Sequence, residues 1–291
     1  AGIAGQILIL GYTPASEAEK LLKYDITQTL VSEEHARSML GFRIKAQFAI
    51  DTGMNRIGLD GDDVAGCAKI IRRYAGEFCL TGIFTHLCVA DTPEENLFTQ
   101  SQTAKFRRVA GEVKDLQLPF VHCMNSAGGL WQPPFGNLAR LGIILYGLKP
   151  DFSNELPEGI RPAMQWKSVI SMIKKVHAGE TVGYGRTFRA GKDMLVATVP
   201  TGYADGYRRE LSNRGHVLIN GKCAPVVGRV CMDQFMIDVT DIAEAGFESE
   251  VTLLGDGYDA DAMAHDIGTI GYEIVCGIGK RVPRVWLPGT D

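Results

Sequence analysis

Four short segments in the first half of the chain place a polar or charged side chain at one end of an apolar run. They are DTGMNRIG (residues 51–58) with Arg56, FTHLCVAD (84–91) with His86, HCMNSAGG (122–129) with Ser126, and LARLGIILYG (138–147) with Arg140. The planar guanidinium of Arg56 is suited to binding a carboxylate. Taken singly, Arg56 is also explained as a solvated turn residue and His86 as a structural histidine. Both interpretations stay open at this point.

The last two segments together indicate an anion site. Arg140 begins an apolar run, where an unpaired charge is costly and requires a partner. The backbone N–H groups of Gly142 and Ile143, with the Ser126 hydroxyl, could hold an anion such as a phosphate. In the second half, PTGYADGYRR (200–209) and GRVCMDQFMIDVTD (228–241) stand out. The tyrosine of GYADG, taken alone, could be only a packed turn residue.

The composition excludes several classes of protein. The formal charge of −4 over 291 residues gives no basic surface for nucleic acid or an anionic membrane. Seven cysteines form no CxxC pair and six histidines form no HExxH, so neither a disulfide framework nor a metal site is expected. Scattered thiols favour a reducing, cytoplasmic compartment. No apolar run reaches the length of a membrane span. AGIAGQILILGYTP enters an apolar strand at once, unlike a signal peptide, as if the chain began within a fold.

Short apolar strands alternate with amphipathic helices in the first half. The predicted strands are 7–10, 27–32, 44–50, 80–86, 120–125 and 141–146, and the predicted helices are 14–23, 33–40, 62–75 and 96–116. This alternation predicts a parallel sheet with crossover helices. A (β/α)8 barrel needs about 250 residues, so six strands leave two units that would precede residue 1. An open doubly wound sheet of six strands is the alternative, but no Gly-rich dinucleotide loop follows the first strand.

A linker, PDFSNELPEGIRPA (150–163), separates this half from a β-rich second half. The predicted strands there are 167–176, 195–200, 216–220, 224–230, 234–239, 250–254 and 282–286, with helical periodicity only around 259–272. We therefore predict two domains, residues 1–158 and 159–291.

Taken in order, the motifs resemble one family along the whole chain. The succession is ILGYTP, DTGMNRIG, THLCVAD, HCMNSA, RLGIILYG, VGYGRTF, GYADGY, VGRVCMDQ, TIGYEI and RVPRV. It resembles the alanine racemases, which are dependent on pyridoxal 5'-phosphate. The resemblance implies a (β/α)8 TIM barrel, with its first two β/α units absent from this chain, followed by a mostly β domain. It also implies a homodimer with shared active sites.

The resemblance assigns roles to individual residues. The family holds the cofactor as a Schiff base to a lysine on one face of the substrate, and a tyrosine of the neighbouring subunit, matched by Tyr203, serves the other face. His86 would pack against the pyridine ring, and Arg140 would face its nitrogen. The remaining assignments are Ser126, Gly142, Ile143 and Tyr272 for the phosphate, Arg56 and the Met232 N–H for the substrate carboxylate, and Asp233 as a residue that orients them.

The chain departs from the family pattern at three points. The lysine motif is absent, and Lys45 and Lys105 match no cofactor position. Ala49 replaces a lysine whose carbamate steadies the arginine in many members. We therefore expect chloride, or else a neighbouring carboxylate, beside Arg56; the carboxylate is disfavoured, because the motif offers only Asp51, which we expect to stabilise the loop. Gly271 stands where asparagine is common.

The expected function is interconversion of L- and D-alanine by a two-base mechanism, for peptidoglycan precursor supply. A serine or broad-specificity racemase of the same fold is the nearest alternative, and some of these are fused to a membrane segment. Tyr272 favours alanine, because the family narrows the pocket with that side chain. A non-catalytic carrier of the cofactor and an inactive form that acts through dimerisation are the remaining alternatives. Membrane attachment through an upstream region stays open.

Overall fold

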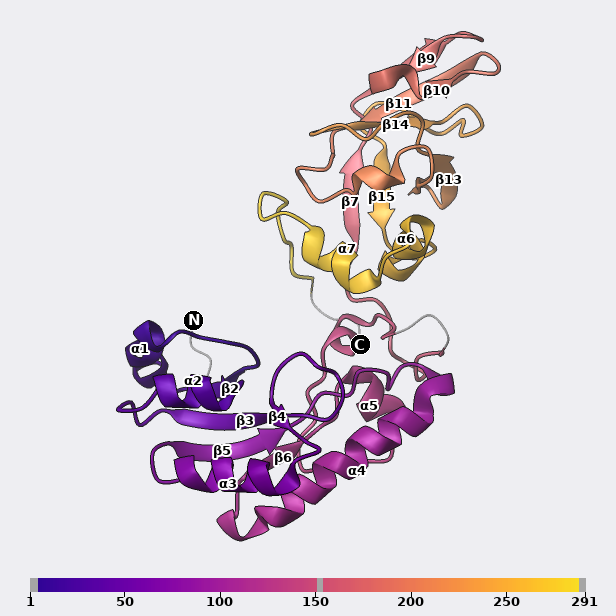
Figure 1. Ribbon diagram of the computed structural model, residues 1–291. Coiled ribbons are helices and arrows are strands. Elements are labelled where there is room, and N and C mark those ends of the chain that lie inside the picture. Colours follow the sequence, from indigo (N-terminus) through magenta and orange to yellow (C-terminus); the bar gives the residue numbers. More distant parts are fainter. Residues whose placement is uncertain (1–4, 151–153, 288–291) are drawn as a thin grey trace. The chain divides into compact units, whose positions relative to one another are not determined.

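The computed structural model describes residues 5–150 and 154–287 (Figure 1). By its internal contacts the chain divides into two compact units, residues 1–142 and 143–291. The domain boundary expected between residues 158 and 159 stays a prediction, because part of that linker, residues 151–153, lies outside the described residues.

The first unit is built on one parallel sheet. Its strands are β1 (Ile7–Ile9), β2 (Ile26–Leu30), β3 (Lys45–Asp51), β5 (Cys79–Phe84) and β6 (Phe120–His122), with the short β4 (Leu59–Asp60) paired to β3. The spatial order β1-β2-β3-β5-β6 follows the chain without reversal. A doubly wound sheet reverses its order at a switch point, whereas a barrel adds each strand beside the last. The barrel prediction is confirmed, and Figure 1 shows the sheet curling.

Helices connect these strands. They are α1 (Ala18–Lys23), α2 (Glu33–Ser38), α3 (Val64–Tyr74), α4 (Asn96–Glu112) and α5 (Ser126–Trp131). The Ser32 side chain accepts a hydrogen bond from the His35 N–H at the start of α2, and Asp63 caps α3 through the Gly66 N–H. Such caps satisfy the free amides of a first helical turn. The buried residues of α3 recur at helical spacing and therefore face the sheet.

The core of this unit lies between the sheet and its helices. Phe48 and Ile50 of β3, Ile71 of α3, Ile83 of β5 and Phe106 of α4 are all buried in it. The central strand β3 is buried on both faces over most of its length. It therefore reads as a nearly continuous apolar run rather than an alternating one.

The predicted strand at residues 141–146 is wrong. The chain makes a single bridge between Met124 and Ala139, and the Arg140 N–H donates to the Met124 carbonyl at 2.8 Å. It then leaves the sheet and forms a 3-10 turn at Ile143–Tyr146. The apolar run 141–146 is too short for periodicity to separate a strand from a buried turn.

The second unit is mostly β, as predicted. One antiparallel sheet has the order β14-β11-β8 and another β13-β12-β15-β7, beside a hairpin of β9 and β10. The strands are β7 (Trp166–Val169), β8 (Met172–Val176), β9 (Thr181–Val182), β10 (Phe188–Arg189), β11 (Met194–Val199), β12 (His216–Ile219), β13 (Lys222–Pro225), β14 (Phe235–Asp238) and β15 (Glu250–Leu254).

Several predicted elements of this unit differ from the structure. The expected strand 224–230 is a strand only as far as Pro225, the last residue of β13. The expected strand 167–176 is two strands, β7 and β8, and residues 282–286 form no strand. The helical stretch 259–272 is divided into α6 (Ala260–Ile267) and α7 (Gly271–Gly277). Gly268, at φ 72°, ends α6 in the left-handed region that glycine adopts without strain.

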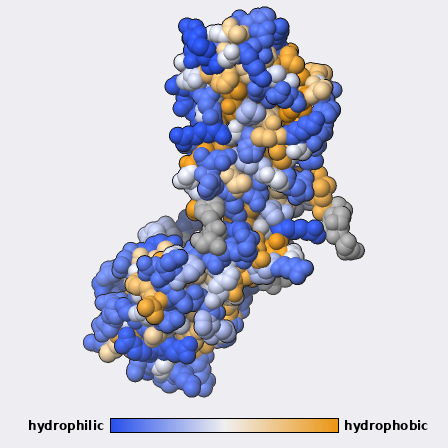
Figure 2. Space-filling model, turned by 90° about the vertical axis from the view of Figure 1, so that its right-hand side faces the viewer, coloured by the Kyte–Doolittle hydropathy of each residue, from blue (hydrophilic) through white to orange (hydrophobic). Residues whose placement is uncertain are grey.

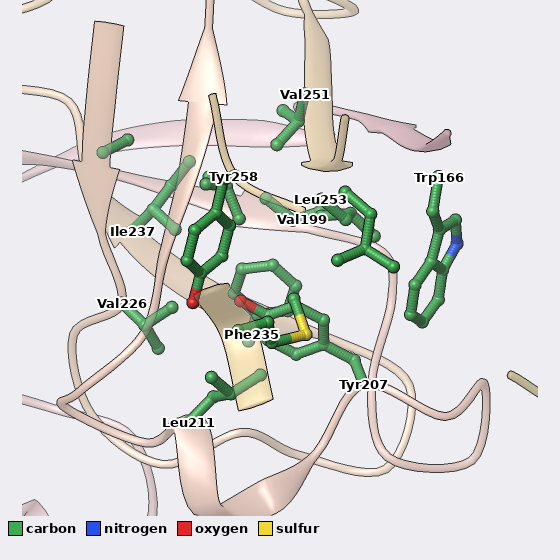
Figure 3. Close-up of a cluster of buried hydrophobic side chains, with 14 of the residues drawn as sticks. Trp166, Val199, Tyr207, Leu211, Val226, Phe235, Ile237, Val251, Leu253 and Tyr258 are labelled. Atoms are coloured by element: carbon green, nitrogen blue, oxygen red, sulfur yellow. The ribbon is translucent and has the colours of Figure 1, made fainter. Parts of the chain in front are cut away.

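Aromatic side chains fill the core of the second unit (Figure 3). The rings of Tyr207 and Phe235 stack with centroids 4.3 Å apart, and Trp166 meets Tyr207 edge-on. Leu211 and Leu253 pack into the same cluster. This core fixes the loops that begin at residues 200 and 228.

Hydrophilic residues predominate on the face shown in Figure 2, and hydrophobic ones form small groups. Over residues 5–150 and 154–287, no helix is both long and apolar enough to cross a bilayer.

Candidate active site

Arg140 is the centre of a buried polar cluster in the first unit. One terminal nitrogen donates to His122 Nδ1 at 2.6 Å, and the other donates to the Thr85 carbonyl at 2.8 Å. The second nitrogen also lies 3.4 Å from His86 Nδ1 and from the Cys123 carbonyl. The Nε atom is buried and has no hydrogen-bond partner among the described residues. An unmet N–H donor on a buried cation is costly and requires an acceptor.

The electrostatics of this cluster keep its histidines neutral and its arginine charged. Burial, then the Arg140 and Arg56 cations, lower the pKa of His86 to about 4. Burial and Arg140 lower the pKa of His122 to about 3. Burial lowers the pKa of Arg140 to about 10, so the guanidinium stays protonated at neutral pH. The cluster is therefore a single fixed cation surrounded by neutral acceptors.

The loop that carries Arg56 is held by its own first residue. Asp51 Oδ1 accepts from the Gly53 N–H at 2.9 Å and the Asn55 N–H at 3.1 Å. Gly58, at φ 123°, lies so close to β3 that a Cβ there would stand 2.5 Å from the Asp51 nitrogen. The Asp51 carboxylate thus bonds the backbone of the loop and does not pair with the Arg56 side chain.

Arg56 and His86 line one small pocket, together with Ala49, Asp51, Met54, Phe84 and Thr85. Ala49 is 2% exposed and offers only a methyl group where a charged side chain would balance Arg56. Within the part of the chain that the structure describes, no carboxylate pairs with the Arg56 guanidinium. The arrangement leaves a cation free to receive an anion.

Ser126 and Gly142, two of the residues predicted to hold an anion, lie in direct contact. The Gly142 N–H donates to Ser126 Oγ at 2.8 Å, and a Cβ at Gly142 would approach that oxygen to 3.6 Å. Ser126 is the first residue of α5, whose preceding Asn125 side chain accepts from the Gly128 N–H. Ile143 follows Gly142 directly and begins the 3-10 turn.

Tyr203 and Met232 lie together in the second unit. The Tyr203 N–H donates to the Cys231 carbonyl and the Ala204 N–H to the Met232 carbonyl, both at 3.0 Å. Gly202 permits this approach, because a Cβ there would stand 2.3 Å from the Met232 oxygen. The Met232 N–H itself has no partner in the described residues. Tyr203 is 43% and Met232 is 55% exposed, so both face outward.

Asp233 is engaged with a residue that the sequence analysis did not assign. Its Oδ1 pairs with one Arg281 nitrogen at 2.6 Å, and Arg281 Nε donates to Asp205 Oδ1 at 2.7 Å. Asp205 in turn accepts from the Gly202 N–H at 2.8 Å. Arg281 therefore ties the GYADG and CMDQ loops together. The motif RVPRV contains it, but nothing in the motif indicates a partner 48 residues earlier.

Tyr184 is a second tyrosine in the pocket of Tyr203. That pocket is lined by Tyr184, Tyr203, Arg209, Arg229, Val230, Cys231, Met232, Asp233 and Gln234. Tyr184 is 72% exposed and stands on a turn in which Gly183, Gly185 and Arg186 all have positive φ. A non-glycine residue at positive φ marks a backbone held against its preference, often at a functional site. The VGYGRTF motif contains this tyrosine, but its spacing alone does not separate it from a turn residue.

Tyr272 is the second residue of α7, and the unusual Gly271 precedes it. A Cβ at Gly271 would stand 2.1 Å from Asp261 Oδ1, so a larger residue there would require the Asp261 carboxylate to move. Asp261 is held there by the Lys149 N–H at 2.9 Å.

Lys45 and Lys105, which match no cofactor position of the family, both lie in ion pairs. Lys45 Nζ pairs with Asp25 and Lys105 Nζ with Asp62, each at 2.7 Å. Across residues 5–150 and 154–287, no group of three His, Cys, Asp or Glu side chains could hold a metal ion.

Two family models match the chain. The alanine racemase N-terminal domain matches residues 1–150, and the alanine racemase C-terminal domain matches residues 163–286. The chain belongs to the alanine racemase family. The family's racemase from Desulfovibrio desulfuricans is 42% identical over 99% of this chain and 80% of its own length. Relatives are thus somewhat longer than this sequence.

Solved structures of alanine racemases have the same fold. The enzyme from Enterococcus faecalis matches with a TM-score of 0.89 at 33% identity, over 97% of this chain and 78% of its own. The enzyme from Bartonella henselae, with covalently bound pyridoxal phosphate, matches with a TM-score of 0.86 at 28% identity, over 97% and 79%. The curled parallel sheet therefore belongs to the family's α/β barrel, and the β-rich unit to its C-terminal domain.

Proposed function

We propose that this protein is an alanine racemase, which interconverts L- and D-alanine with pyridoxal 5'-phosphate and supplies D-alanine for peptidoglycan. The observation that carries the proposal is the Arg140 guanidinium. It is buried, positively charged and surrounded by acceptors on every nitrogen except Nε. Family membership over most of the chain supports the racemase reaction. Arg140 supports the choice of cofactor, because its free Nε donor matches an acceptor nitrogen in the pyridine ring.

The residues fit the cofactor. An unprotonated pyridine nitrogen is an acceptor, and Arg140 Nε is a buried donor without one. When bound, pyridoxal phosphate withdraws electrons from the substrate carbon that loses its proton. Arg140, with a pKa of about 10, donates a hydrogen bond and keeps its proton. Arg140 would thereby orient the cofactor ring through its buried Nε without transferring a proton to it.

The other binding roles follow the family resemblance. Ser126 Oγ and the Gly142 N–H, already 2.8 Å apart, are proposed to hold the phosphate, with Ile143 and Tyr272 completing the set. Arg56 and the unpartnered Met232 N–H are proposed to bind the substrate carboxylate, with Asp233 fixing the Met232 loop through Arg281. We place a chloride beside Arg56, because the methyl of Ala49 leaves its charge unbalanced.

The second base is a tyrosine of the outward pocket, in a homodimer whose subunits share their sites. Tyr203 is the assignment from the motif. Tyr184 is the second candidate, supported by its greater exposure, 72% against 43%, and by its constrained turn. Either hydroxyl moves a proton at the substrate carbon opposite the lysine. A cytoplasmic location remains part of the proposal, since all seven cysteines are free thiols.

The test uses the full-length protein with each enantiomer of alanine and of serine, followed by chiral chromatography. Racemisation of alanine in both directions, at a kcat/KM well above that for serine, is the expected result. Equal or greater rates with serine would give the broad-specificity alternative. Binding of the cofactor without turnover of either amino acid would give the carrier. Sedimentation of the loaded protein as a monomer would contradict the shared-site dimer.

A further inference from the structure

A buried glutamine contacts the Arg140 cluster through His122. Gln47 lies on β3 and is 4% exposed, and His122 at the end of β6 is fully buried. Gln47 Oε1 lies 2.7 Å from His122 Nε2, and Arg140 lies 2.6 Å from the other ring nitrogen, Nδ1. The three side chains are thus linked in series, Gln47 to His122 to Arg140.

The chemistry of the three groups fixes the position of every proton in this line. Arginine has donors and no acceptor, so His122 Nδ1 must accept with its lone pair. A neutral imidazole then carries its proton on Nε2, and that N–H needs an acceptor. The Gln47 carbonyl oxygen is the group at that position.

We propose that Gln47 is a positioning residue for the racemase reaction: it locks His122 in the Nε2–H tautomer, and His122 thereby orients the Arg140 guanidinium. The inference rests on the proposed function for its effect on turnover. It concerns this chain's own side chains, so the tautomer is measurable in any state of the protein.

The surroundings of His122 support a lock of this kind. The Phe84 ring stacks on the imidazole at 5.2 Å with an angle of 18° between the planes, and Arg140 lies over the same Phe84 ring. The imidazole is therefore confined, and Arg140 is the charged group that faces it. Burial and this cation lower the pKa of His122 to about 3, which keeps it neutral.

The lock also explains why the residue is an amide and not an acid. A carboxylate at position 47 would stabilise a proton on both ring nitrogens and raise the pKa of His122. His122 Nδ1 would then carry a hydrogen toward Arg140, placing two donors and two cations 2.6 Å apart. The Arg140 guanidinium would have to move, and its Nε donor would no longer lie where the cofactor ring is proposed to bind.

The test compares Gln47→Glu and Gln47→Met with Gln28→Met. Gln28 is also fully buried, on the adjacent β2, but bonds the Gly11 and Thr29 carbonyls and not His122. The full-length protein, with 15N-labelled histidine and bound cofactor, is examined by NMR at the side-chain nitrogens from pH 5.5 to 8.5. Wild type and Gln28→Met should show His122 with a bare Nδ1 and a protonated Nε2 at every pH.

In Gln47→Glu, both His122 nitrogens should be protonated at pH 7, and kcat should fall about tenfold or more, with KM for alanine changed less than about twofold. The split is expected because the proposed function assigns the substrate carboxylate to Arg56 and the Met232 N–H and not to Arg140. Gln47→Met should show a mixture of the two His122 tautomers. This variant provides the test if Gln47→Glu does not fold. A wild-type His122 protonated on Nδ1, or an unchanged tautomer in both position-47 variants, would overturn the proposal. That result is distinct from absence of racemisation in the wild type, which overturns only the proposed function.

Discussion

Gly58 ends the segment that carries Arg56, and it lies where the backbone of β3 leaves no room for a side chain. In Gly58→Ala, the new Cβ would stand 2.5 Å from the Asp51 nitrogen, 2.8 Å from the Ile50 carbonyl carbon and 3.0 Å from the Ala49 carbonyl carbon. All three atoms are backbone of β3, the buried central strand, so they cannot move aside as a flexible side chain would. The φ of 123° adds a conformational penalty that alanine incurs and glycine does not.

The matched control is Gly41→Ala. Gly41 has a φ of 91° but no atom within 4 Å of its Cβ position, so it reports the conformational penalty alone. That penalty is about 1 kcal/mol, and overpacking against fixed atoms adds roughly 2 kcal/mol more. We expect Gly58→Ala to lower the free energy of unfolding by about 3 kcal/mol and Gly41→Ala by about 1 kcal/mol, measured by urea denaturation.

The Gly58 variant should also raise KM for alanine, because its loop carries Arg56, whereas the Gly41 variant should not. Equal losses of stability in the two variants would refute the close-approach argument. An unchanged KM in Gly58→Ala would refute the proposed link between this loop and the substrate carboxylate.

The remaining predictions concern the tyrosines, the anion and the pH dependence. Of Tyr203→Phe and Tyr184→Phe, the variant that lacks the base should lose about a hundredfold or more of the racemisation rate, and the other only a few-fold. Small, equal losses in both variants would exclude both tyrosines as the base. Exchange of chloride for gluconate at constant ionic strength should raise KM for alanine several-fold through Arg56, and a chloride-independent KM would contradict the anion. Because the pKa values of His86 and His122 are lowered to about 4 and about 3, the unfolded chain binds more protons below its own histidine pKa of about 6.5. The free energy of unfolding should therefore fall as pH drops from about 6.5 toward 4, by up to about 1.4 kcal/mol per unit for each histidine, and a flat urea-denaturation series over that range would count against their burial as neutral rings.

Much of the fold was predictable because strand and helix periods alternate clearly between residues 7 and 122. The error at residues 141–146 arose because a run of six residues is too short to show a period. Its path is set by hydrogen bonds from the Arg140 N–H to Met124 and from the Gly142 N–H to Ser126, which lie earlier in the chain. The second unit was predicted as β-rich, but the break between β7 and β8 follows from tertiary pairing: β7 pairs with β15 and β8 with β11.

The candidate site was predictable where one residue carried its own signal, as Arg140 did by its place in an apolar run. Gln47 gave none, because a glutamine in a strand is ordinarily assigned to an exposed face. Arg281 likewise needs the folded chain to meet Asp205 and Asp233. Such contacts join residues that are far apart in the sequence, so the residues around each of them do not predict the partner.

The order of strands has a consequence for the way in which each unit reaches its folded state. In the first unit every strand of the main path pairs with the strand preceding it on that path, so each closure spans one helix and its loops. Such short closures lose little chain entropy, and the sheet can grow from one edge as the polypeptide leaves the ribosome. In the second unit, Trp166–Val169 pairs with Glu250–Leu254, so that sheet cannot be completed until residue 254 has been synthesised. Pulse-labelled hydrogen exchange should accordingly find the parallel sheet protected before the four-stranded antiparallel one.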